Sequence, residues 1–180
     1  DPRKRKQAIL GANDGASGTA VVLELARQLQ NARRYRGVIL VLFDGEDYGP
    51  GRENMYLGSK YFAKHYAGPK PEWAVVVDMV GDKDLRLPIE GYSRKNAPGA
   101  VERIWRTAER MGQSAFVREK GPYIMDDHVP LQKAGIEAID VIDFTYPYWH
   151  TLEDTPDKCS AESLQSVGAV VLEALLDKGY

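Results

Sequence analysis

The sequence predicts a three-layer α/β fold, in which a mostly parallel, mixed central sheet carries helices on both faces. Three observations lead to this class. Short runs rich in β-branched residues alternate with amphipathic segments along the 180 residues. Two of the runs, Val38–Phe43 and Trp73–Val80, are apolar enough to be strands buried on both faces. Acidic residues end both runs, and the carboxyl ends of strands are where open α/β sheets bind ligands.

Helical spacing and turn residues place the other elements. Ser17 is a candidate cap for a helix that runs from Thr19 to about Ala32. A glycine–proline pair at 68–69 ends a second helix, Gly58–Tyr66. We also expect strands at Asp84–Ile89, Ala115–Arg118 and Ile136–Phe144, and helices at Pro98–Met111, Asp127–Ala134 and Ala161–Leu176.

Length and composition narrow the class of protein. A chain of 180 residues fits a single domain, 1–180, and its 43% hydrophobic content with a net charge of −2 is ordinary for a globular protein. The sequence has no basic patch that would indicate a nucleic-acid partner. No apolar run approaches the roughly 20 residues of a membrane span. The single cysteine, Cys159, excludes an internal disulfide but leaves the compartment open.

Three acids end the first apolar run. Asp44, Glu46 and Asp47 follow Phe43, and Gly45 permits a tight turn between them. Crowded carboxylates repel one another, so they require a cation or shared protons if they are covered. An isolated acidic turn is most often a solvated surface feature. The metal-site interpretation therefore depends on what other segments contribute.

Two further acids have unusual surroundings. Asp14 lies in the glycine-rich segment GANDGASG, directly before a predicted helix. The glycine spacing fits neither a dinucleotide loop nor a phosphate loop, and no lysine follows it, so a plain turn is the alternative. Asp78 interrupts a run of valines, which is costly unless the carboxylate is hydrogen-bonded or bound to a cation. A structural, hydrogen-bonded aspartate is the alternative there.

The chain has three histidines. His65 lies on the polar face of a predicted helix, and we expect no function for it. His128 follows two acids and is a candidate cap or supporting group. His150 ends the aromatic segment YPYWH after a predicted strand, which makes it the better metal candidate. An aspartate, a glutamate–aspartate pair and a histidine on separate loops match the ligands of catalytic zinc, and one carboxylate of the pair is then free to move a proton.

Five segments together resemble metallopeptidase family 28, the zinc aminopeptidases and the related zinc-dependent glutaminyl cyclases. They are GANDGASG, FDGEDYG followed by YLGSKYFAKH, VVVDMVGD, DDHVPLQKAG and YWHTLEDTPDKCS, in the order of the family. The resemblance covers nearly the whole chain and implies a zinc-exopeptidase-like fold. It also implies one or two zinc ions, a peptide substrate with a free N-terminus and an extracytoplasmic location.

The resemblance implies a role for each matching residue. Glu46 is implied as the general base and acid, and Asp126 as an acid beside the substrate. Tyr148 and Trp149 are implied as residues that line the substrate pocket. The implied metal ligands are Asp14, Asp47, Asp78 and His150, with Asp78 holding a second zinc ion in the peptidases or joining an acid network in the cyclases.

Two departures from the family pattern matter. Asp47 stands where the family often has glutamate, so its shorter side chain must approach the metal more closely. The upstream His-x-Asp motif of the family has no match among the thirteen residues before Asp14, so we expect native sequence, including the first strands, to precede Asp1. The leading prediction is an aminopeptidase-like zinc hydrolase. The alternatives are a glutaminyl cyclase and an inactive truncated relative.

Overall fold

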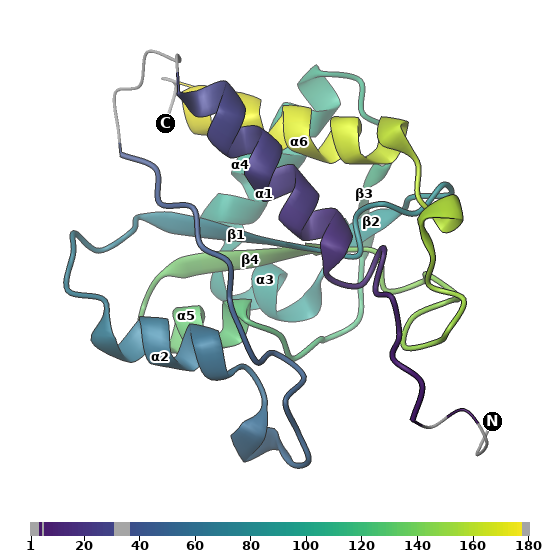
Figure 1. Cartoon of the computed structure of the whole chain (residues 1–180). Coiled ribbons are helices and arrows are strands. Elements are labelled where there is room, and N and C mark those ends of the chain that lie inside the picture. The colour runs from purple at the N-terminus through teal and green to yellow at the C-terminus, as the bar shows by residue number, and fades with distance from the viewer. Residues whose placement is uncertain (1–3, 5, 31–36, 178–180) are drawn as a thin grey trace.

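The computed structural model describes residues 4, 6–30 and 37–177, and its strands form two parallel pairs. β1 (Trp73–Asp78) pairs with β4 (Glu137–Ile142). β2 (Leu87–Ile89) pairs with β3 (Phe116–Lys120), and β2 also contacts β4. Figure 1 shows these strands in the middle of the molecule. The predicted parallel pairing is confirmed for these four strands.

Helices cover both faces of the strands (Figure 1). Their bounds are Ala16–Leu29 (α1), Leu57–His65 (α2), Gly91–Asn96 (α3), Pro98–Arg110 (α4), His128–Lys133 (α5) and Ala161–Leu176 (α6), with 3₁₀ turns at Arg52–Asn54 and Pro156–Lys158. On one face, α1 contacts β1 and α6, and α4 contacts β4 and α6. On the other face, α3 and α5 contact β4, and α2 packs on α5. The predicted three-layer α/β class is therefore confirmed.

The main core lies between the strands and the helices α1, α4 and α6. The apolar face of α4 supplies the fully buried side chains of Ile104 and Trp105, which belong to one cluster with Ile139 of β4. These α4 residues follow the helical spacing seen in the sequence. Trp105 packs edge-on against Phe116 and donates its ring N–H to the carbonyl of Val117 at 3.1 Å. This packing fixes the layer of strands whose ends carry the site.

The predicted central strand at Val38–Phe43 is wrong. This segment joins no strand pair among the residues that the structure describes, and Ile39, Leu40 and Leu42 are 45%, 39% and 57% exposed. A mostly apolar cavity of about 450 Å³ is lined by residues 37–41 on one side and 73–77 on the other. We call this cavity the β1 slot. A strand buried on both faces needs hydrogen-bonded neighbours. The backbones of residues 37–41 and 73–77, on the two sides of the β1 slot, form no strand pair with each other.

The start of α1 also differs from the prediction. The helix begins at Ala16 because Gly15 takes a left-handed φ of 106° and turns the chain into the helix. Ser17 lies inside the helix and is not its cap. Its hydroxyl donates to the carbonyl of Asn13 at 2.6 Å. The predicted end of this helix, at Ala32, lies outside the described residues.

α3 forms where the sequence predicted an irregular loop. Glu90 caps this helix, since its carboxylate accepts hydrogen bonds from the N–H groups of Tyr92 and Ser93. Glutamate is not a preferred capping residue, so the sequence pattern contains no capping signal. The other predicted helices and strands are confirmed to within a few residues at each end. None of the described helices combines the length and apolar character that crossing a membrane requires.

Candidate metal and catalytic site

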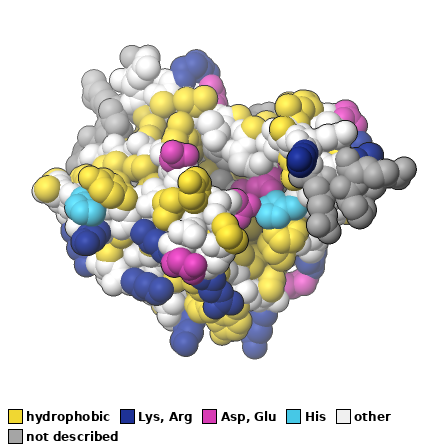
Figure 2. All heavy atoms as spheres, turned by 60° about the horizontal axis from the view of Figure 1, so that its bottom comes forward, with side chains coloured by type: hydrophobic (Ala, Val, Ile, Leu, Met, Phe, Trp, Pro, Cys, Tyr) yellow, Lys and Arg dark blue, Asp and Glu magenta, His cyan; other side chains and the backbone are white. Residues whose placement is uncertain are grey.

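Three side chains from separate loops meet at one point of the surface. The Nε2 atom of His150 lies 2.8 Å from Asp47 Oδ2 and 3.3 Å from Asp14 Oδ2. Asp14 precedes α1, Asp47 precedes α2, and His150 follows β4. All three side chains are partly exposed, with His150 at 43%. On the face in Figure 2, a histidine borders acidic side chains and has hydrophobic side chains nearby. The structure thus brings together the three residues that the sequence placed at one site.

The donor set fits a zinc ion in chemistry and nearly in spacing. Zinc binds imidazole nitrogen and carboxylate oxygen at about 2.0–2.2 Å in tetrahedral sites, which puts neighbouring donors roughly 3.3–3.6 Å apart. The 3.3 Å between Asp14 and His150 matches this spacing, whereas the 2.8 Å between Asp47 and His150 is a direct contact. Within the described part of the chain, no group of three potential ligands already has the spacing that holding a metal ion requires. Opening the Asp47–His150 contact by about half an ångström gives the required spacing.

Backbone strain is concentrated at this site. Among the described non-glycine residues, left-handed φ angles occur at Tyr56 (57°), Met79 (46°) and His150 (56°). Such a conformation costs about 1–3 kcal/mol and persists where the surroundings enforce it. Met79 follows Asp78, and the N–H of Tyr56 donates to the carbonyl of Glu46. Since strained backbones cluster at active sites, the three angles make this region a candidate functional site on grounds separate from its side-chain chemistry.

Asp154 fixes the loop that carries Asp14. Its fully buried carboxylate accepts the N–H of Asn13 at 2.8 Å, the N–H of Asp14 at 3.0 Å and the hydroxyl of Tyr146 at 2.8 Å. The amide oxygen of Asn13 accepts the N–H of Gly81, shortly after β1, at 2.7 Å. The loop before α1 is therefore tied both to the end of β1 and to the segment that follows β4.

The first turn of α2 holds the turn that carries Glu46. The N–H groups of Tyr56, Leu57 and Gly58 donate to the carbonyls of Glu46, Gly45 and Asp44 at 2.7, 3.0 and 2.8 Å. These are helix-end donors that the helix itself cannot satisfy. A Cβ atom at position 58 would lie 2.6 Å from the backbone nitrogen of Asp44, so this close approach requires glycine. The start of α2 thereby fixes the acid that the sequence predicted as general base.

Crowded carboxylates raise one another's pKa values in the protein without a metal. Burial, followed by the charges of Asp126 and Asp47, raises the pKa of Glu46 to about 9. Burial raises the pKa of Asp78 well above its ordinary range, and the charges of Asp126 and Asp14 add to the shift. Burial also raises the pKa of Asp14, against the opposing effect of the nearby imidazole. Asp78 therefore belongs to the same acidic group, which needs protons or a cation to be tolerated.

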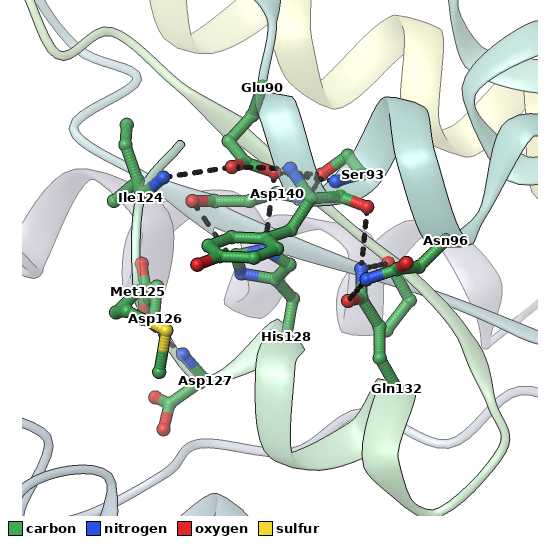
Figure 3. Close-up of polar contacts among 12 residues, drawn as sticks. Glu90, Ser93, Asn96, Ile124, Met125, Asp126, Asp127, His128, Gln132 and Asp140 are labelled. Atoms are coloured by element: carbon green, nitrogen blue, oxygen red, sulfur yellow. Dashed lines mark hydrogen bonds and ion pairs between the residues drawn. The ribbon is translucent and has the colours of Figure 1, made fainter. Parts of the chain in front are cut away.

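Asp126 lies on a segment that a buried set of side chains holds in place (Figure 3). His128 is fully buried at the start of α5, with its Nε2 atom 3.2 Å from Glu90 Oε2 and its Nδ1 atom 3.9 Å from Asp140 Oδ2. We call Glu90, His128 and Asp140 the buried cluster. Glu90 also accepts the N–H of Ile124 at 2.9 Å. Glu90 thus contacts the chain on both sides of Asp126.

The two carboxyl groups of the buried cluster differ in charge. Burial alone would raise the pKa of Glu90, but contacts with His128 and with the N–H groups of Ile124, Ser93 and Tyr92 lower it to about 2. Burial, followed by the charges of Asp126 and Asp78, raises the pKa of Asp140 well above its ordinary range. Both oxygens of Asp140 lack a hydrogen bond of ordinary geometry among the described residues. The surroundings therefore favour the anionic form of Glu90 and shift Asp140 toward its neutral form.

The two predicted substrate-pocket residues differ in position. Trp149 is 41% exposed, and its ring stacks on the imidazole of His150 with 4.1 Å between ring centroids. Tyr148 is partly buried, packs edge-on against Tyr146, and has the Nζ atom of Lys158 4.9 Å from its ring centroid. Trp149 is therefore accessible to a substrate beside the candidate ligands, whereas Tyr148 packs into a small interior cluster.

Sequence reasoning missed four buried acids: Glu90, Asp140, Asp143 and Asp154. Asp140 interrupts an apolar strand as Asp78 does, so the signal for it was present. Asp154 lies within one of the family-like segments, but its hydrogen-bond partners are distant in the sequence, so its structural role could not be recognised. Glu90 had no such signal, because its role depends on contacts with residues distant in the sequence. Of the other histidines, His128 is a supporting group, and His65 is exposed on α2 as expected.

Comparison with protein families matches residues 1–175 to Peptidase family M28. The chain belongs to this family. The M28 chain is 29% identical over 183 residues to Aminopeptidase YwaD of Bacillus subtilis (strain 168), and 23% identical over 214 residues to the glutaminyl-peptide cyclotransferase of Bothrops jararaca. These matches cover 93% and 98% of this chain but 37% and 58% of the relatives. The chain thus spans only part of each relative's length.

Solved structures of M28-like enzymes share the fold. A leucine aminopeptidase precursor from Bacteroides thetaiotaomicron has a TM-score of 0.94 at 34% identity, covering 99% of this chain and 66% of its own. A glutaminyl cyclase from Fimbriiglobus ruber has a TM-score of 0.91 at 39% identity, with 98% and 64% covered. A Zn-dependent exopeptidase from Parabacteroides distasonis has a TM-score of 0.93 at 32% identity, with 99% and 67% covered. Aminopeptidases and cyclases are therefore both similar to this M28 chain.

Proposed function

We propose that this chain forms the zinc site of an enzyme that acts on the N-terminal residue of peptides, with hydrolysis of the first peptide bond as the leading reaction. The observation that carries the proposal is the convergence of Asp14, Asp47 and His150. Glu46 lies one residue before Asp47 in the sequence and is partly buried. The similarity to an aminopeptidase and to a Zn-dependent exopeptidase supports it.

Asp14, Asp47 and His150 would hold the zinc ion, and Glu46 would move the proton. Bound zinc supplies a Lewis acid, and its charge favours the ionised form of neighbouring carboxylates. Glu46, once ionised, takes a proton from the attacking water and gives it to the leaving amine. The acidic group around Asp126 suits the positive charge of a free α-amino group. The exposed ring of the tryptophan beside the ligands would pack against the side chain of the first residue.

Cyclisation of an N-terminal glutamine is the second candidate. Among the described residues, one histidine joins the donor set, and the pKa of Asp78 is raised first by burial and then by the charges of Asp126 and Asp14. This arrangement favours a single ion, and one ion per chain is what the cyclase-like alternative expects. In that reaction Glu46 would pass a proton from the attacking α-amine to the departing ammonia. The similarity to glutaminyl cyclases supports this candidate.

Two peptides separate these reactions in protein loaded with zinc. An unblocked leucyl peptide reports hydrolysis through released leucine, and a glutaminyl peptide reports cyclisation through ammonia release without chain cleavage. Glu46→Gln is expected to lower the active reaction by about 10²–10⁴-fold while zinc content stays the same. Glu53→Gln, an exposed change in the same loop region, is expected to keep the activity. Full turnover by Glu46→Gln would remove Glu46 from the role, and a zinc-loaded wild type inactive on both peptides would overturn the proposed function.

A further inference from the structure

Tyr56 joins the two chain segments that carry the proposed catalytic acids. Its backbone N–H donates to the carbonyl of Glu46 at 2.7 Å, and its hydroxyl donates to the carbonyl of Met125 at 2.6 Å. Met125 directly precedes Asp126. The tyrosine is 8% exposed, so these two hydrogen bonds are made largely away from water. One residue therefore bonds to the turn of the proposed general base and to the segment of the second acid.

The backbone of Tyr56 indicates that its side chain is needed at this position. Its φ of 57° lies in the left-handed region, which glycine adopts without strain and other residues adopt rarely. A glycine here could donate the same N–H to Glu46, but it would have no hydroxyl to reach Met125. A tyrosine at this position can therefore form both hydrogen bonds, to Glu46 and to Met125, whereas a glycine can form only the first. Strain of this kind is found where a functional geometry must be held.

The neighbouring charges keep the hydroxyl of Tyr56 a donor. Burial, followed by the charges of Glu46 and Asp126, raises the pKa of Tyr56 to about 12. The phenol therefore keeps its proton over the working pH range of an enzyme, and the bond to Met125 persists. Ser59, one turn further along α2, is fully buried and donates its hydroxyl to the carbonyl of Tyr56 at 3.3 Å, and its proximity opposes the rise that burial causes in the pKa of Asp127. The first turn of α2 thus contacts the Asp126 segment at two points.

We propose that Tyr56 is a positioning residue that keeps Glu46, which moves the proton, in register with Asp126, the acid beside the substrate. The proposal rests on the proposed function, because it takes those two acids as the catalytic pair. It goes beyond that function by assigning their alignment to a residue that touches neither the candidate metal ligands nor the substrate. Loss of the hydroxyl would leave Asp14, Asp47 and His150 unchanged, so zinc binding should remain while the chemical step slows.

The test compares Tyr56→Phe with Tyr61→Phe. Tyr61→Phe removes the hydroxyl of a tyrosine that is 67% exposed on the same helix. In Tyr56→Phe we expect kcat to fall about tenfold on whichever peptide the wild type turns over, because misplacement of catalytic groups by less than 1 Å is felt in the rate. We expect zinc content to stay within twofold of the wild type, and KM to rise by less than kcat falls. Tyr61→Phe is expected to match the wild type in all three measurements.

Hydrogen exchange of the metal-free protein tests, without relying on activity, whether Tyr56 holds the two segments together. Peptides covering residues 44–47 and 124–128 are expected to exchange faster together in Tyr56→Phe and to stay unchanged in Tyr61→Phe. Unchanged exchange in both segments, or an unchanged kcat in Tyr56→Phe, would overturn the proposal. Equal losses of kcat and zinc content would also overturn it, because they indicate general damage to the site. A wild type inactive on both peptides would refute the proposed function, and exchange would still decide whether Tyr56 links the segments.

Discussion

His150 and His128 each lie near two carboxylates, but only His150 is accessible to water. The His150 side chain is 43% exposed, and its neighbours Asp14 and Asp47 are 24% and 47% exposed. His128 and both of its neighbours in the buried cluster are 0% exposed. An exposed set can exchange contacts among its members for contacts with an incoming ion. A buried set has no such route, so its charges act as fixed constraints on the surrounding chain.

This difference shows that residue composition alone does not define a metal site. Both sets contain one imidazole and two carboxyl groups. Burial separates their chemistry: it raises the pKa of Asp140 well above its ordinary range, whereas contacts with His128 and backbone N–H groups overcome burial at Glu90 and lower its pKa to about 2. We therefore expect changes around His150 to alter metal binding and activity, and changes in the buried cluster to alter stability.

The largest expected effect is that of His150→Ala. Loss of a direct ligand should lower zinc affinity by more than about 100-fold, since loss of an outer partner already costs 10–100-fold. Activity should fall to background, while the unfolding midpoint of the metal-free protein stays close to the wild type because the side chain is exposed. Zinc titration followed by calorimetry and urea unfolding measure the two quantities. Wild-type zinc affinity in this variant would contradict the assignment of His150 as a metal ligand.

Glu90→Gln should have the opposite profile, with zinc binding kept and stability lost. Removing one charge of a buried contact costs about 3–5 kcal/mol, because the partners remain buried and unpaired. Glu24→Gln is the matched control, since the pKa of Glu24 is also lowered to about 2, by hydrogen bonds from Arg27 and Gln28, but the side chain is exposed. The control should unfold like the wild type. Equal urea midpoints for the two variants would contradict the assigned role of burial.

Asp140→Asn should stabilise the metal-free protein at neutral pH. The folded pKa of Asp140 lies above its ordinary value of 3.8, so its contribution to stability is present at low pH and is lost as the pH rises toward the folded pKa. The loss amounts to about 1.4 kcal/mol per pH unit over that range. Asparagine has no such titration. Urea unfolding at pH 4, 5.5 and 7.5 should show a gain over wild type that grows with pH, and a gain independent of pH would argue against the neutral acid.

The smallest effect is expected for His65→Gln. His65 is exposed on α2, stacks on Tyr61 with 4.1 Å between ring centroids, and has no carboxylate partner among the ion pairs of the described residues. Exposed substitutions of this kind change stability by less than about 0.5 kcal/mol. Zinc affinity, turnover and the urea midpoint should all match the wild type. A loss of zinc affinity would mean that a histidine outside both sets contributes to the metal site.

The exposed site could be predicted because each of its parts is marked locally in the sequence. Asp14, Asp47 and His150 each follow a segment with a clear strand or turn pattern, and strand ends meet at one edge of an α/β sheet. The family resemblance then assigned a role to each residue. The helices α4 and α6 were predictable for a similar reason, since spacing along one helix determines which face is buried.

The buried cluster could not be predicted, because its properties arise from packing between distant segments. Glu90 follows β2, His128 begins α5 and Asp140 lies in β4, and their contacts exist only in the folded chain. The error at Val38–Phe43 has a related cause. Its β-branched residues favour a strand, but strand formation also requires a hydrogen-bonded neighbour, and local sequence does not show whether one is within reach.

The β1 slot has a practical consequence for handling the protein. One edge of β1 is open among the described residues, and Ile39, Leu40 and Leu42 are exposed on the facing segment. Open strand edges with apolar borders recruit further chains, and a net charge of −2 gives little repulsion to oppose this. Solutions of these 180 residues should therefore turn cloudy on concentration, sooner in high salt, and a short extended peptide that docks in the slot should keep them clear.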